Sequence, residues 1–115
     1  MPDLVSFVTT VNRPIYEFNN KKYIDIEVPD EIIQHIEYVH EPFKTLHNNP
    51  LKGNVLRVKV PYRYKKVDCT VEGLVPIQSM NKGDGISISI QFCGLWDGIM
   101  YWKISSIRHI NKNIY

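Results

Sequence analysis

Strict alternation of apolar and polar residues is the feature that most constrains this chain. In residues 86–92, every second position is isoleucine or phenylalanine, and Ser87, Ser89 and Gln91 lie between them. Successive side chains of a β-strand point to opposite faces of its sheet, so this pattern predicts a strand with one buried face. Similar alternation over residues 54–60, 66–72 and 100–108 predicts that the C-terminal half consists mainly of strands.

The N-terminal half adds further strands and one helix. Residues 4–12 predict a strand that Arg13-Pro14 should break, and Asn19-Asn20 predicts a hairpin turn between residues 15–18 and 22–28. Residues 30–48 predict a helix that Pro42 should either kink or restart. Its apolar residues recur at spacings of three and four: Ile32, Ile36, Val39, Phe43 and Leu46.

These patterns together predict the fold class. One helix among many strands indicates an α+β, mostly β domain, either a small bent sheet or an OB-like barrel with one main helix between strands. The 115 residues suffice for a single domain, residues 1–115, with one core.

Charge is segregated along the chain, although the net charge is only +2. Every full charge in residues 25–41 is negative: Asp25, Glu27, Asp30, Glu31, Glu37 and Glu41. Every full charge in residues 52–66 is positive: Lys52, Arg57, Lys59, Arg63, Lys65 and Lys66. A near-neutral total can therefore hide a local field that attracts a polyanion.

The basic segment allows two geometries around Pro61. If the strand continues through the proline, its cations line one face and can follow a phosphate backbone. If the strand ends there, residues 61–66 form an exposed loop in which tyrosines alternate with cations, a typical arrangement for stacking bases and neutralising phosphates. Tyr62 and Tyr64 share the phase of the aliphatic positions, so core packing is the alternative for both rings. Trp96, expected in a short loop between glycines, is the other candidate for base stacking, with capping of the core as the alternative.

The segment ISISIQFCGLWDGIMYWKISSI resembles the last hairpin of small viral single-strand-binding OB-fold proteins. The resemblance covers about a quarter of the chain. In an OB-fold the helix lies between the third and fourth strands, and the resemblance implies binding through the barrel face and its connecting loops.

The sequence lacks the motifs of the common catalytic sites. The chain has no phosphate-binding loop, and no Asp or Glu is followed two positions later by Lys, as in many metal nucleases. His40 and His47 lie seven residues apart with no cysteine nearby, which favours part-buried or surface imidazoles over zinc ligands. Cys69 and Cys93 each alternate with apolar neighbours and are expected to be buried, reduced thiols. We expect no enzyme activity, no metal and no cofactor.

Location follows from what the segments lack. No apolar run reaches the length of a membrane helix, and the first ten residues do not resemble a signal peptide. We therefore expect an intracellular protein, cytoplasmic or nuclear, with no membrane partner. The absence of alanine beside abundant Ile, Asn, Lys and Tyr suggests an AT-rich genome and hence a viral protein in its host cell.

The leading hypothesis is sequence-tolerant, non-enzymatic binding of single-stranded DNA or RNA. The residues expected to contact nucleic acid are Arg57, Lys59, Tyr62, Arg63, Tyr64, Lys65, Lys66 and Trp96. The alternative is a protein–protein interaction module, such as a viral adaptor or host-factor antagonist. Its acidic helix and basic strand would then face a protein partner or a second copy of the chain.

Overall fold

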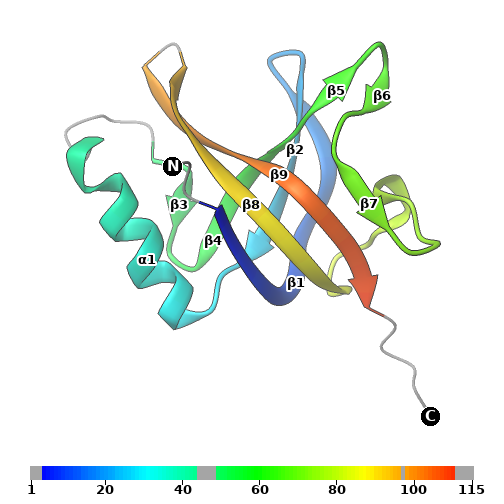
Figure 1. The fold of residues 1–115 in the computed structure, drawn as a ribbon, viewed down its shortest axis with the longest axis horizontal. Helices are drawn as coiled ribbons and strands as arrows, with labels where there is room; N and C mark the ends of the chain where they lie inside the picture. Colours follow the sequence, from blue (N-terminus) through cyan, green and yellow to red (C-terminus); the bar gives the residue numbers. More distant parts are fainter. Residues whose placement is uncertain (1–3, 44–48, 97, 111–115) are drawn as a thin grey trace.

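The computed structural model describes residues 4–43, 49–96 and 98–110, and it describes the backbone but not the side chain of Trp96 (Figure 1). Its elements, in chain order, are β1 (Leu4–Phe18), β2 (Lys21–Glu27), α1 (Asp30–His40), η1 (Glu41–Phe43), β3 (Leu51–Lys52), β4 (Val55–Val60), β5 (Tyr62–Arg63), β6 (Lys66–Val67), β7 (Thr70–Glu72), η2 (Ile77–Ser79), β8 (Gly85–Trp96) and β9 (Ile99–Ile110).

Five strands close into a barrel. Antiparallel pairs join β1 to β2, β2 to β4, β1 to β8 and β8 to β9, and a parallel contact between Lys59 of β4 and Lys103 of β9 closes the circle. The short strands β3 and β7 extend the sheet beside β4 and β9. The predicted class, α+β and mostly β with an OB-like barrel, is confirmed.

The N-terminal strand is longer than the sequence suggests. We expected Arg13-Pro14 to break it, and this expectation is wrong, because β1 continues through both residues to Phe18. Its pairing with β2 shifts register between Val11 and Arg13 and again between Arg13 and Tyr16. Such bulges leave backbone groups out of the ladder, so a residue without an N–H can be accommodated.

This continuity changes the position of the helix in the strand order. Since β1 and β2 are the first two barrel strands, α1 lies between the second and third, not between the third and fourth as the resemblance implied. The helix ends at His40, and Pro42 falls in the 3-10 turn η1. The rest of the predicted helix, residues 44–48 with Leu46 and His47, lies outside the described residues.

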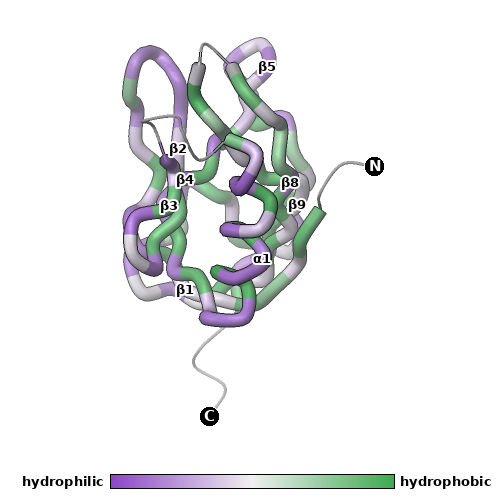
Figure 2. The backbone as a smooth tube through the Cα atoms, turned by 90° about the vertical axis from the view of Figure 1, so that its left-hand side faces the viewer, coloured by the Kyte–Doolittle hydropathy of each residue, from purple (hydrophilic) through white to green (hydrophobic). Residues whose placement is uncertain are grey.

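The barrel interior is filled by the apolar positions of the alternating segments. Each barrel strand contributes side chains that are almost fully buried, among them Val11, Ile24, Ile26, Leu56, Val58, Ile88, Ile90, Trp102 and Ile104. Residues 32, 33, 36 and 39 of α1 pack against this core. Figure 2 shows α1 in front of the strands, with purple residues along much of its length. Burying one face of every strand fixes the opposite face to the outside.

His40 anchors the end of α1 to the barrel. Its ring is buried, and its Nε2 accepts a hydrogen bond from Trp102 Nε1 at 2.9 Å. Phe92 lies against both rings, with centroid distances of 5.8 Å to His40 and 5.2 Å to Trp102. This cluster fixes the position of the helix on the barrel.

Of the helices described, none has the length and apolar character needed to cross a lipid bilayer.

Candidate functional site

A groove of about 620 Å³ lies on the outside of the barrel over β2 and β4. The turn between β1 and β2 forms one wall, and the first residues of β9 form the other. We refer to this hollow as the groove. The lining residues that give it its chemical character are Phe18, Lys21, Tyr23, Asp25, Arg57, Lys59 and Tyr101.

The pleat of the strands explains why these side chains share the groove. In β4, Arg57 and Lys59 point outward because Leu56, Val58 and Val60 fill the core. Antiparallel pairing then places Tyr23 opposite Lys59 and Asp25 opposite Arg57. The strand register therefore brings cationic and aromatic residues together from segments distant in sequence.

The cationic groups of the groove lie beside its aromatic rings. The Arg57 guanidinium lies 5.5 Å from the centre of the Tyr23 ring and 5.6 Å from that of Phe18. The Lys59 ammonium lies 5.5 Å from the centre of the Tyr101 ring. Contacts of this kind stabilise a cation beside the face of a ring. The groove thus offers π-faces next to positive charge.

Positive charge is concentrated around Lys59. Burial and the neighbouring charges of Lys21 and Lys103 lower the pKa of Lys59, while Cys93 acts in the opposite direction. The repulsion among these lysines is relieved when an anion binds between them, and binding should therefore raise the pKa of Lys59. Lys21, Lys59 and Lys103 thus bring three positive charges near one another.

One carboxylate is built into the groove. Asp25 Oδ1 accepts a hydrogen bond from the Tyr16 hydroxyl at 2.7 Å. Burial and this partner raise the pKa of Tyr16 to about 12. The Arg13 guanidinium lies 3.8 Å from the centre of the Tyr16 ring. Asp25 thus helps fix this part of the wall and disfavours phosphate in its immediate surroundings.

The structure divides the predicted basic site into two parts. Arg57 and Lys59 line the groove, as the alternation predicts. Strand β4 then ends at Val60, and a two-stranded hairpin, β5–β6, carries the next cations: Arg63, Lys65 and Lys66. The strand therefore ends before Pro61, as in the second geometry allowed by the sequence, but the residues that follow form a hairpin and not the expected exposed loop. Arg57 and Lys59 therefore do not share one continuous strand with the three cations of the hairpin.

The hairpin β5–β6 turns at Tyr64 and Lys65, both of which have positive φ angles, 54° and 65°. Tyr64 is 86% exposed and its ring lies 5.7 Å from the Arg63 guanidinium. The tips of β5–β6 and of β1–β2 project toward the same end of the molecule (Figure 1). The expected strand 66–72 is split here into β6 and β7.

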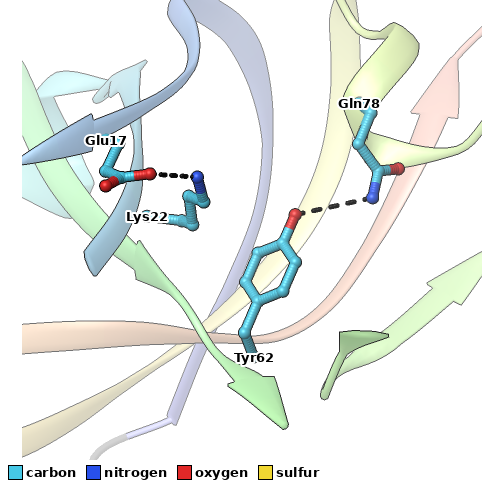
Figure 3. Close-up of polar contacts among 4 residues, drawn as sticks. All are labelled: Glu17, Lys22, Tyr62 and Gln78. Carbon is cyan, nitrogen blue, oxygen red and sulfur yellow. Dashed lines mark hydrogen bonds and ion pairs between the residues drawn. The ribbon is translucent and has the colours of Figure 1, made fainter. Parts of the chain in front are cut away.

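Tyr62 has a structural role in this region. Its ring is half-buried against the core, and its hydroxyl accepts a hydrogen bond from Gln78 Nε2 at 3.5 Å (Figure 3). The same view shows the ion pair between Glu17 and Lys22, 2.5 Å apart, which ties the two strands of the β1–β2 hairpin together. Of the two candidate tyrosines, Tyr62 belongs with the core and Tyr64 with the surface.

Trp96 was expected in a loop, but its backbone forms the last residue of β8. The strand passes a bulge between Phe92 and Leu95, where Gly94 adopts a φ of 81° that favours glycine. The position of the Trp96 side chain lies outside the described residues.

Sequence reasoning missed the aromatic half of the groove. Phe18, Tyr23 and Tyr101 were not singled out, although Tyr23 and Tyr101 alternate with the buried residues Ile24 and Trp102. An aromatic residue on the polar face of an alternating strand was the available signal. Its significance depends on neighbours that only the barrel closure supplies.

The two cysteines are the remaining candidate groups among the described residues. Cys69 and Cys93 are free thiols; both are half-buried, so the expectation of full burial was too strong. Burial raises the pKa of the Cys69 thiol to about 11. Within the described ranges, no three His, Cys, Asp or Glu side chains gather closely enough to hold a metal ion.

No protein-family model matches the chain, and no curated protein or solved structure shows significant similarity to it.

Proposed function

We propose that this chain binds single-stranded nucleic acid in the groove over β2 and β4. The observation that carries the proposal is the pairing of cations with aromatic rings on that surface, Arg57 beside Tyr23 and Phe18, and Lys59 beside Tyr101. Bases stack on aromatic faces whatever their sequence, and cations neutralise the phosphates between them. A single strand is the preferred ligand because its bases are free to turn toward the rings.

The position of the groove on the barrel supports the same function. OB barrels bind oligonucleotides over their second and third strands and the adjoining loops. In this chain β2 and β4 are the second and third barrel strands, and the groove extends from the β1–β2 turn to the start of β9. The strand would continue from the groove toward Arg63 and Tyr64 on the β5–β6 hairpin. We further propose that the protein is of viral origin, acts inside the host cell and catalyses no reaction.

Charge reversal in the groove tests this proposal. A fluorescently labelled single strand of twelve thymidines is titrated with wild-type protein and with Arg57→Glu/Lys59→Glu, and anisotropy is recorded at several salt concentrations. The variant should bind far more weakly, and the log–log salt slope should shrink by about 1.4, that is roughly 0.7 for each lost phosphate contact. The matched control is Lys82→Glu/Arg108→Glu, which reverses two exposed cations outside the groove and should leave the slope unchanged.

Ring removal distinguishes stacking from charge attraction. Tyr23→Ala or Tyr101→Ala should weaken binding by about 1–3 kcal/mol and leave the salt slope almost unchanged. A duplex of the same length and an oligouridine strand show whether the groove selects single strands and whether it prefers DNA or RNA. Equal losses of affinity in the groove variant and the control variant would refute the groove as the binding surface.

A further inference from the structure

Helix α1 presents an acidic, exposed face with one large aromatic residue. Asp30, Glu31 and Glu37 are exposed, and Tyr38 on the same helix is 79% exposed. No lysine or arginine occurs within the helix, and the C-terminal end of its dipole adds negative potential near Glu37. This face, which we term the helix face, repels nucleic acid and suits a basic partner with an apolar centre.

A second hollow, of about 560 Å³, lies between β6–β7 and η2. Its lining is mainly apolar, with Val67, Val71 and Ile77 among its residues, and Lys65 and Lys66 add positive charge. Leu74, also in the lining, is 100% exposed. The hollow thus combines an exposed apolar side chain with positive charge. The helix face combines an exposed aromatic side chain with negative charge, so the two surfaces are complementary.

The helix face and this hollow cannot meet within one molecule. In Figure 1, α1 lies at one end of the longest axis, whereas β6, β7 and the η2 segment lie at the other. Neither surface includes the residues that give the groove its chemical character, so an occupied hollow leaves Arg57 and Lys59 accessible. Complementary surfaces at opposite ends of one chain are suited to contact between successive copies.

We propose that the helix face of one copy docks in the hollow of a second copy, with Tyr38 against Leu74 and Glu37 near Lys65 and Lys66. The contact is heterologous: it joins two different surfaces, so it leaves one of each free and can extend into a chain of molecules. If the groove binds a single strand as proposed above, the same contact makes binding cooperative along that strand. The self-association itself does not depend on nucleic acid.

Two single substitutions test the helix face and the hollow independently. Tyr38→Ala removes the aromatic residue of the helix face, and Leu74→Ser removes the leucine of the hollow; both side chains are exposed, so the fold should be retained, which a melting curve checks. Sedimentation velocity without nucleic acid, over a wide range of protein concentration, should show concentration-dependent association of the wild-type protein. Each variant alone should associate at least tenfold more weakly, since exposed anchors of this kind dominate small interfaces.

An equimolar mixture of the two variants gives the decisive measurement. The intact hollow of Tyr38→Ala receives the intact helix face of Leu74→Ser, so the mixture should form dimers with wild-type affinity but nothing larger. The control Val8→Asp changes an apolar side chain that is 63% exposed outside both surfaces, and should associate like the wild-type protein. High salt should weaken every association because the charges involved are exposed.

Three outcomes would overturn the proposal: a wild-type protein that stays monomeric throughout, a Leu74→Ser protein that still dimerises, or a mixture that forms no dimer. The second outcome would indicate a symmetric contact between two helix faces. Nucleic-acid affinity of the monomeric variants, measured by anisotropy, is a separate result. Loss of self-association with retained strand binding leaves the proposed function intact, and the converse leaves the docking contact intact.

Discussion

Acidification from pH 7 to pH 5 should destabilise the fold through His40, which is only 5% exposed. The hydrogen bond from Trp102 Nε1 requires a neutral imidazole with a lone pair on Nε2, because a protonated ring has no acceptor. The other ring nitrogen, Nδ1, finds no partner among the described residues. Burial accordingly lowers the pKa of His40 below its ordinary value of 6.5.

The magnitude follows from proton linkage. In the unfolded chain His40 takes up a proton near pH 6.5, whereas the folded chain resists it, so the stabilisation is fully present above pH 6.5 and declines as the pH falls below it. The slope approaches about 1.4 kcal/mol per pH unit. The loss between pH 7 and pH 5 therefore has an upper limit of about 2 kcal/mol, or a decrease of about 8 °C in Tm for a chain of this size, which is reached by a ring that stays neutral at pH 5.

The measurement compares urea unfolding of the wild-type protein and His40→Gln at pH 7, 6 and 5. Glutamine retains a carbonyl oxygen that can accept the Trp102 hydrogen bond, but it does not titrate. Carboxylates titrate alike in both proteins, so the wild-type protein should lose more stability than the variant over this range, by up to about 2 kcal/mol. A difference between the two unfolding free energies that stays constant from pH 7 to pH 5 refutes the reasoning.

Three further predictions concern other parts of the molecule. Asp25→Asn removes the negative charge from the groove and should strengthen single-strand binding about three- to tenfold at low salt, with little gain at high salt; an unchanged affinity would place the strand elsewhere. In a Cys93→Ser background, Cys69 should react with a thiol reagent about tenfold more slowly than an ordinary thiol, because its pKa of about 11 leaves about 100-fold less thiolate than the usual 9.0 and the greater nucleophilicity of that thiolate offsets part of the loss; rapid labelling of the native protein would contradict this. Asn19 and Asn20 both have positive φ angles, 52° and 64°, so replacing both with alanine should cost about 1–2 kcal/mol in urea unfolding, whereas Asn20→Gly should be close to neutral.

The sequence alone determined which face of each strand is buried. Alternation is a local property, and it correctly assigned Leu56 and Val58 to the core and Arg57 and Lys59 to the outside. It also identified the helix from Asp30 and the Asn19-Asn20 turn, because helix periodicity and turn preference act over a few neighbouring residues.

Proline shows where local rules reached their limit. Pro14 lies inside β1 because the surrounding bulges accommodate a residue without an N–H, whereas Pro61 follows the end of β4. The same residue type therefore has opposite effects at two positions. The difference comes from strand pairing, which involves partners far along the chain.

Tertiary structure alone decided the composition of the groove. The groove takes Tyr23, Arg57 and Tyr101 from three segments whose alternation looks ordinary in isolation. The closure of β4 against β9 places these residues around the groove. It also separated the hairpin of β5 and β6 from the groove, although both belong to one basic run in the sequence. Period-two patterning fixes the direction of each side chain, but its neighbours depend on strand order and register, which are set by packing the whole core at once.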